Sequence, residues 1–345
     1  MYNKGKKILI DIVKWVLAAL VAIIILNIVC FVYHRPVGWI ERTNSSTNWI
    51  WDPGKLVVWG KEGYGIHRVD NRGYVNEDKP LINNGYILIM GASHSQGLHV
   101  RQGERYSDLL NSMLGYDNEL GVYNVAQDGQ TLDQMITNFA ALTKEFPDSK
   151  AVVIEIYRTD YSKFKFDFDE GGLIQTSFDY KNVGQNVRNR LSNSKKASIA
   201  IKEYLPVINL IKEQMIDKID MDCRKNDELA ESEPSCTYEQ LNKAFNTLRE
   251  EYSGNIVVIY HPYTNIREDG SVSLDEDEYK AEFIACCNSN GIDFIDASER
   301  TLELMENGTA IYGFANTQLG KGHLNKNGHK LLAEMLSDYF GEYND

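Results

Sequence analysis

The chain has few cysteines, and none of them is spaced to bind zinc. Five cysteines are spread over 345 residues, without a Cys-x-x-Cys pair or a Cys and His pattern of the zinc-site kind. Cys30 falls in an apolar run, whereas Cys286 and Cys287 are adjacent in a helical pattern, where we expect buried thiols. Cys223 and Cys236 flank a polar, acidic segment and could form a disulfide outside the cell. We predict neither a metal site nor a cofactor.

A basic surface is also lacking. The formal net charge is −13, and the first 35 residues carry a net charge of +4, which leaves −17 for the remainder. Phosphate binding needs a basic surface, so the acidic body argues against nucleic acid as a partner. The hydrophobic content of 43% and the charged content of 25% are ordinary for a globular protein, and we find no internal repeat.

One long hydrophobic run stands near the N-terminus, at residues 8–33. Between Trp15 and Tyr33 it has no charge, and Asn27 is its only strongly polar residue. This length crosses a hydrocarbon core of about 30 Å. Lysines precede the run, so we predict a single-pass membrane protein with a cytoplasmic N-terminus and an extracellular C-terminal domain. The alternatives are a buried core helix or a cleaved signal peptide, although no small-x-small cleavage site follows the run.

Residues 36–84 form a membrane-proximal lead-in. They are rich in Trp, Gly, Asn and Tyr, and tryptophans close to a span often lie at the membrane interface. Turn signals fill residues 70–80, which predicts a loop there. We expect the lead-in to pack against the main domain.

The main domain, residues 85–345, alternates strand and helix patterns. Predicted strands cover 86–90, a short run from 121 that ends at Gln127-Asp128-Gly129, then 151–157, 256–260 and 292–295. Predicted helices cover 131–146, 238–252, 277–288 and a last helix capped by Asn325 or Asn327. Such alternation predicts a three-layer α/β fold with about five parallel strands. The alternation of strand and helix patterns stops at residues 161–236. We expect a helical insertion there, with a helix over 183–219, and the insertion could serve as a lid.

Four residues fall at carboxyl ends of predicted strands or beside the last helix. Ser93 follows the first strand of the domain and is either a nucleophile in a tight turn or a helix N-cap. A serine nucleophile needs a base, and His323 can serve because imidazole titrates near neutrality. The backbone N–H groups of Ser93 and Gly129 and the hydroxyl of Thr159 could stabilise an oxyanion.

These residues stand in motifs that resemble those of the SGNH, or GDSL-type, hydrolases. The tract GASHS at 91–95 is similar to the first block of that family, with Ser93 at the nucleophile. Gly129 resembles the second-block glycine, residues 157–160 fall where the family has G-x-N-D, and His323 is similar to the histidine of the last block. The resemblance implies a flavodoxin-like sheet and acyl-ester chemistry through a serine acyl intermediate.

The chain departs from the family pattern at three positions. Ala92 replaces the first-block Asp, which is not the nucleophile. Thr159 stands where the oxyanion Asn is expected. Gly320 stands where the family has the acid that orients the histidine, so the carbonyl of Gly320, the carboxylate of Asp296 or another carboxylate must orient His323 instead.

Several neighbouring residues have alternative interpretations. Ser95 is a rival nucleophile, although its position favours the start of a helix. His94 could face substrate, and His261 could line the cleft, but the step into Pro262 favours a turn. His329 is expected to pack in the last helix.

The sequence thus predicts a membrane-anchored extracellular serine acyl-esterase or O-acyltransferase. The resemblance implies acyl esters as substrates and a membrane O-acyltransferase as a further partner, and the anchor implies a substrate held at the cell surface, such as an acetylated glycan. Two other hypotheses stay open: a catalytically degenerate family member that binds a glycan or a partner, and a purely structural component of the cell envelope.

Overall fold

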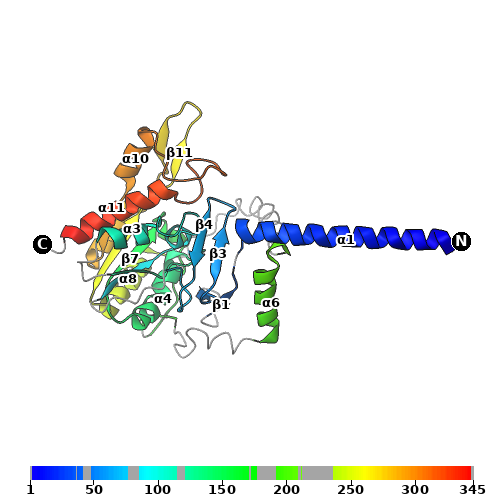
Figure 1. Cartoon of the computed structure of the whole chain (residues 1–345). Coiled ribbons are helices and arrows are strands. Elements are labelled where there is room, and N and C mark those ends of the chain that lie inside the picture. Colours follow the sequence, from blue (N-terminus) through cyan, green and yellow to red (C-terminus); the bar gives the residue numbers. More distant parts are fainter. Residues whose placement is uncertain are drawn as a thin grey trace.

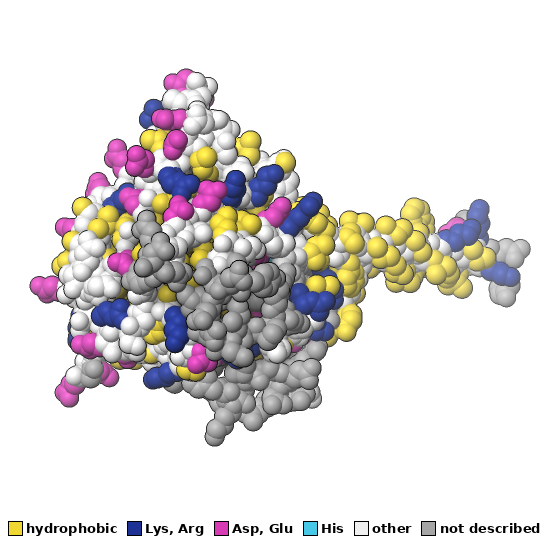
Figure 2. Space-filling view, turned by 60° about the vertical axis from the view of Figure 1, so that its left-hand side comes forward, with side chains coloured by type: hydrophobic (Ala, Val, Ile, Leu, Met, Phe, Trp, Pro, Cys, Tyr) yellow, Lys and Arg dark blue, Asp and Glu magenta, His cyan; other side chains and the backbone are white. Residues whose placement is uncertain are grey.

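The structure is a computed structural model of the whole chain. It describes residues 2–35, 37–41, 48–76, 85–114, 121–170, 172–176, 192–208, 211 and 236–342. One long helix, α1 (Tyr2–Tyr33), projects from a compact body and carries the N-terminus at its far end (Figure 1). From residue 15 onward most of its side chains are apolar and exposed, as the yellow surface in Figure 2 shows, and its charged residues lie near the N-terminus. By length and composition, α1 could cross a membrane.

A five-stranded parallel sheet forms the centre of the body. Its strands are β5 (Tyr86–Met90), β6 (Gly121–Asn124), β7 (Ser149–Ile156), β10 (Asn255–Tyr260) and β13 (Asp293–Asp296). The spatial order is β13-β10-β7-β5-β6, with every neighbouring pair parallel. The five predicted strands are therefore confirmed. The strand order reverses at β5, and in such sheets ligands bind at the carboxyl ends of the strands beside this point.

Helices cover both faces of the sheet because the strand side chains alternate between two cores. Leu88 and Met90 belong to the core under α4, α8 and α9, whereas Ile87 and Ile89 belong to the core under α3 and α11. Each of these fully buried side chains stabilises the fold by roughly 1.5–3 kcal/mol. The helices are α3 (Tyr106–Met113), α4 (Leu132–Glu145), α8 (Tyr238–Glu251), α9 (Lys280–Ser289), α10 (Ser298–Glu306) and α11 (Lys326–Glu342).

Side-chain caps fix where two of these helices begin. The predicted capping box of Thr131 and Gln134 is present at the start of α4. Asn325 caps α11, because its side-chain oxygen accepts from the backbone N–H of Asn327 at 2.8 Å. The helix α10 and the hairpin of β11 (Thr264–Ile266) and β12 (Val272–Leu274) were not predicted.

The lead-in folds as two antiparallel strand pairs beside the sheet. The pairs are β1 (Trp39–Glu41) with β2 (Trp49–Trp51) and β3 (Leu56–Trp59) with β4 (Gly65–Arg68). They share a small core that includes Val57, Val69 and Leu98, the last of which belongs to the main domain. The end of α1 joins this hairpin: Arg35 pairs with Val58, and the hydroxyl of Tyr64 donates to the carbonyl of Val32 at 2.8 Å. The lead-in thus connects α1 to the main domain.

Only part of the insertion is described. It contains a short turn of helix, η1 (Tyr161–Lys163), the strands β8 (Phe168–Asp169) and β9 (Gly172–Leu173), and the helix α6 (Asn193–Tyr204). The predicted helix over 183–219 is therefore seen as α6, and much of its remaining range lies outside the described residues. Cys223 also lies outside them, whereas Cys236 is a buried free thiol.

Candidate active site

Ser93 is the first residue of a short helix, α2 (Ser93–Gln96), directly after β5. The N-cap of α2 is Ala92, so the interpretation of Ser93 as the cap is wrong. The turn that precedes it depends on Gly91, where a Cβ would lie 2.1 Å from the hydroxyl of Ser95 and 2.7 Å from the carboxylate of Glu155. The sharp turn places the half-buried Ser93 at the carboxyl end of the sheet, at the point where the strand order reverses.

His323 comes from the other end of the chain and reaches the same point. Its Nε2 lies 2.9 Å from the Oγ of Ser93, although the two residues are 230 positions apart. This distance allows a direct hydrogen bond between serine and imidazole. The sequence-based prediction that the two residues meet agrees with this geometry.

The carboxylate that orients His323 is Glu62, which the sequence analysis did not identify. Glu62 Oε2 lies 2.6 Å from His323 Nδ1, and its Oε1 accepts from the backbone N–H of His323 at 2.8 Å. The two alternatives are wrong on geometric grounds. The carbonyl of Gly320 accepts from the hydroxyl of Thr264 at 3.1 Å, and Asp296 forms an ion pair with Lys280 at 2.5 Å.

The turn that carries Glu62 is clamped to the main domain. Residues 60–64 connect β3 to β4, and the side chain of Asn316 contacts the backbone on both sides of Glu62. Its oxygen accepts from the N–H of Gly63 at 2.9 Å, and its amide donates to the carbonyls of Gly60 at 3.1 Å and Gly63 at 3.2 Å. Room for the carboxylate comes from Gly322, where a Cβ would lie 2.2 Å from Glu62 Oε1.

The environment keeps Glu62 ionised. Burial pushes the pKa of Glu62 upward, but hydrogen bonds from the side chain and backbone of His323, together with charge attraction, outweigh it, and the pKa lies below its ordinary value. An ionised carboxylate holds Nδ1 of the imidazole protonated and leaves Nε2 free to accept the proton of Ser93.

A second imidazole, that of His99, stacks on His323. The ring centroids are 3.7 Å apart, and the planes are within 13° of parallel. Burial, followed by the charges of neighbouring histidines, holds the pKa of His99 well below its ordinary value, so this ring stays neutral. Glu62, His99 and His323 each offer a metal-ligand atom within 4.8 Å of the others. Parallel rings direct their in-plane lone pairs side by side, however, and such lone pairs do not converge on one ion.

The predicted oxyanion donors do not all face the site. Gly129 lies in the exposed turn between β6 and α4 and has a φ of +76°, which favours glycine. Thr159 is fully buried, its hydroxyl donates to Asp277, and its N–H donates to the other carboxylate oxygen of Asp277 at 3.0 Å. A threonine hydroxyl has one proton, so the geometry does not support Thr159 as an oxyanion donor. The backbone N–H groups of Ser93 and Gly129 remain.

Beneath Ser93 lies a buried polar network. Glu155 accepts from Ser95 at 2.8 Å and lies 2.8 Å from His261 Nε2, whose Nδ1 lies 2.6 Å from the hydroxyl of Tyr312. Ser95 and His261 are both fully buried. This location excludes Ser95 as an accessible nucleophile and makes His261 part of the support under the turn.

His94 also supports the site from below. It is 2% exposed, its ring centroid lies 5.1 Å from that of His323, and its Nδ1 accepts from the N–H of Leu324 at 3.1 Å. Burial, followed by the charges of other histidines, holds the pKa of His94 well below its ordinary value. A substrate-facing role for His94 does not fit this burial. The expectation that His329 packs in the last helix agrees with its 1% exposure.

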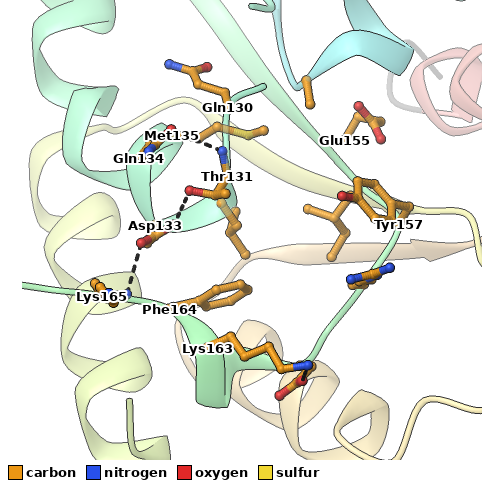
Figure 3. A pocket seen from close by; sticks show the side chains of 15 residues that line it. Gln130, Thr131, Asp133, Gln134, Met135, Glu155, Tyr157, Lys163, Phe164 and Lys165 are labelled. Carbon is orange, nitrogen blue, oxygen red and sulfur yellow. Dashed lines mark hydrogen bonds and ion pairs between the residues drawn. The ribbon is translucent and has the colours of Figure 1, made fainter. Parts of the chain in front are cut away.

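A cavity of about 400 Å³ lies between the start of α4, the end of β7 and the region of η1 (Figure 3). It begins at Ala92 and Gln130, the residues that adjoin Ser93 and Gly129 in the sequence. The lining combines polar and charged side chains with two aromatic rings. Among the lining residues are Thr131, Asp133, Tyr157, Arg158, Lys163 and Phe164. Such a mixture suits a polar ligand with flat apolar faces.

The sequence offered only a weak signal for Glu62. The residue stands in the turn GKEGYG, which follows a short apolar run, LVVW. A charged residue in a hairpin turn is ordinarily exposed to solvent, and a turn 31 positions before Ser93 gives no local pairing with it. Only the packing of the lead-in on the main domain reveals the contact.

Comparisons with known proteins agree with this architecture. A family model described as GDSL-like Lipase/Acylhydrolase matches residues 87–336, a range that contains Ser93 and His323 and leaves out Glu62. Among solved structures, a psychrotrophic esterase, EstA, from Pseudoalteromonas sp. is 13% identical, with 76% of this chain and 100% of that chain covered and a TM-score of 0.37. None of the curated proteins compared with the chain matches it.

Two further solved structures are similar. A putative GDSL-like lipase from Parabacteroides merdae is 14% identical, with coverage of 76% of this chain and 99% of that chain and a TM-score of 0.42. A two-domain esterase active on acetylated mannans is 9% identical, with coverage of 75% of this chain and 49% of that chain and a TM-score of 0.39.

Proposed function

Because the chain belongs to the GDSL-like lipase/acylhydrolase family, we propose that it is a serine acyl-esterase or O-acyltransferase that works through Ser93, His323 and Glu62. The observation that carries the proposal is the continuous hydrogen-bonded line from the hydroxyl of Ser93 through both nitrogens of His323 to the carboxylate of Glu62. This arrangement has the geometry of a serine, histidine and acid triad.

The first half-reaction follows from this geometry. His323 Nε2 takes the hydroxyl proton while Ser93 Oγ attacks the acyl carbonyl carbon, and the carbonyl oxygen becomes an anion that faces the N–H groups of Ser93 and Gly129. The C–O bond to the leaving alcohol then breaks. His323 returns the proton to that alcohol, and Ser93 remains acylated. Glu62 stabilises the imidazolium that forms in between.

The second half-reaction decides between hydrolysis and transfer. Water or the hydroxyl of an acceptor gives its proton to His323 and attacks the acyl carbon, and Ser93 recovers the proton as its bond to the acyl group breaks. With water the product is a free carboxylic acid. With a sugar hydroxyl it is a new ester.

We propose acetyl esters of cell-surface glycans as substrates. Two features support this class. The cavity beside Ala92 and Gln130 combines hydrogen-bonding side chains with the rings of Tyr157 and Phe164, which suits the polar edges and apolar faces of a sugar. The apolar helix α1, as a membrane anchor with a cytoplasmic N-terminus, would hold the domain outside the cell beside such a glycan, within reach of a membrane O-acyltransferase.

A second candidate function is glycan binding without catalysis. The observation that favours it is the engagement of Thr159 by Asp277, which leaves the oxyanion with backbone donors alone among the residues discussed. Loss of one oxyanion-hole donor costs about 10²–10³ in turnover. The intact line of Ser93, His323 and Glu62 favours the enzyme.

The test is intact-mass analysis of the full chain in detergent after incubation with an activated aryl acetate. We expect one acetyl adduct in the wild type and none in Ser93→Ala or His323→Ala. Ser253→Ala is the matched control, because this serine is exposed between α8 and β10, and the variant should keep the adduct. An adduct that persists in Ser93→Ala would refute the proposed nucleophile.

Hydrolysis and transfer are distinguished with the same protein. The acetylated enzyme is mixed with a neutral oligosaccharide, and the products are separated by mass. Acetyl-oligosaccharide indicates transfer, and acetate alone indicates hydrolysis. Binding of the oligosaccharide by a protein that never forms the adduct would favour the second candidate.

A further inference from the structure

The end of α6 contacts the helix α1 through a single polar side chain. The amide of Asn27 in α1 donates to the carbonyl of Tyr204 at 2.8 Å, and its oxygen accepts from the N–H of Val207 at 3.4 Å. These residues are about 180 positions apart in the sequence. The contact fixes the described end of the insertion against the apolar helix.

Both partners of Asn27 are backbone groups left unpaired where α6 ends. Pro206 lacks an N–H and disfavours helical geometry at Leu205, so the helix stops at Tyr204. The N–H of Ile208, which would continue the helix by bonding Tyr204, bonds the carbonyl of Leu205 at 3.0 Å instead. Within the described residues, the carbonyl of Tyr204 accepts from Asn27 in place of a backbone N–H.

Inside a membrane, the side chain of Asn27 and the backbone groups at the end of α6 each need such a partner. Asn27 is the only strongly polar residue between Trp15 and Tyr33. In hydrocarbon, a polar side chain and an open backbone group each need a partner, because no water is there to supply one. Asn27 and the broken end of α6 satisfy each other.

The position of α6 fits the surface of a bilayer. In Figure 1, α6 lies beside the end of α1 that joins the body and runs across the direction of α1 instead of along it. Asn27 stands six residues before the end of α1 at Tyr33, or about 9 Å at 1.5 Å per residue. Interfacial helices lie in the membrane plane at a depth of about 5–10 Å.

The side chains around this break are apolar and exposed. Tyr204 is 60% exposed, Leu205 38%, Ile208 49% and Ile211 56%, and the exposed apolar surface of α1 continues from them. In the sequence, lysines stand before and after these apolar residues, at positions 195, 196, 202 and 212. Apolar side chains with flanking lysines are typical of helices that lie on a bilayer.

We propose that α6 and the residues that follow it, 204–208 and Ile211, form a second membrane contact, and that their partner is the lipid bilayer beside α1. The proposal rests on the proposed role of α1 as a membrane anchor. One transmembrane helix leaves a domain free to rotate and tilt, whereas a second contact beside it fixes which side of the domain faces the lipid.

The test places a small fluorescent amino acid at single positions of the full chain in nanodiscs whose lipids carry bromine in the acyl chains. Labels at Ile208 and Ile211 report the proposed contact. A label at Ile24, which is 58% exposed in the middle of α1, reports the anchor. A label at Ile266, 46% exposed on β11, is the matched control for an exposed isoleucine on the body.

We expect bromine to quench Ile24, Ile208 and Ile211 and to leave Ile266 bright. Quenching at Ile24 with unquenched labels at Ile208 and Ile211 would overturn the second contact and leave the anchor standing. An unquenched label at Ile24 would overturn both the membrane anchor and the second contact. Equal quenching at Ile208 and Ile266 would show that the lipid does not distinguish the two surfaces, and would also overturn the proposal.

Discussion

The carboxylate of Glu62 lies 2.6 Å from Nδ1 of His323, although 261 positions separate the two residues. The serine and the histidine stand within the segment that defines the family, whereas the acid comes from a hairpin outside it. The chemistry therefore depends on how the hairpin packs on the sheet.

Removal of the charge of Glu62 should reduce turnover strongly. In Glu62→Gln the side chain keeps its size, but the amide neither holds the correct tautomer of His323 nor stabilises the imidazolium. We expect kcat for an aryl acetate to fall by up to about 10⁴-fold, the loss known when the acid of a serine triad is replaced by its amide. Glu268→Gln, in the exposed turn between β11 and β12, is the control. Unchanged turnover in Glu62→Gln would exclude Glu62 from the reaction.

Glu62 should also make stability depend on pH. The pKa of Glu62 is lowered on folding. Its contribution to the free energy of unfolding is therefore fully present above the ordinary pKa of 4.5, and it is lost as pH falls through the lowered pKa. The melting temperatures of the wild type and Glu62→Gln should therefore differ at neutral pH and converge in acid. A difference that widens in acid would contradict the lowered pKa.

Gly322 provides the space that Glu62 occupies. In Gly322→Ala the Cβ would lie 2.2 Å from Glu62 Oε1, at a φ of +85°. We expect this variant to lose activity as Glu62→Gln does. Gly308→Ala is a matched control, because Gly308 has a φ of +79° with nothing within 4 Å of an added Cβ. Both variants should lose about 1 kcal/mol through backbone strain, and only Gly322→Ala should lose turnover.

Asn316 should act on catalysis from a distance. It holds the backbone on both sides of Glu62 and does not contact Ser93 in the described structure. In Asn316→Ala the carboxylate would shift from His323, and a displacement of about 1 Å can cost up to 10²-fold. We expect a lower kcat with little change in KM, measured on an aryl acetate. Asn246→Ala, on α8, should behave as the wild type.

Thr159→Val separates an oxyanion role from a structural one. The variant keeps the shape of Thr159 but removes the hydroxyl that donates to Asp277. We expect a loss of about 1–3 kcal/mol in the free energy of unfolding, measured in urea, with turnover nearly unchanged. A hundredfold fall in kcat at constant stability would restore Thr159 to the oxyanion hole.

The sheet was predictable because each of its strands is a short apolar run, and the runs alternate with helical patterns and caps such as Thr131. Ser93 and His323 were predictable because each stands in a motif of fixed local spacing. Glu62 was not, since no local pattern distinguishes a partly buried carboxylate that bonds a histidine from a solvated carboxylate in a turn. The same holds for Thr159, whose motif position suggested a donor before Asp277 was seen to engage it.

The hairpin that carries Glu62 has a consequence for how such an enzyme can change. Ser93 and His323 belong to the segment that the family model matches, but the carboxylate that contacts His323 belongs to a separate hairpin that also joins α1. A gene fragment cut at residue 87 would encode the matched segment without this carboxylate. Conversely, exchange of a short hairpin would change the group beside His323 and leave the whole sheet in place.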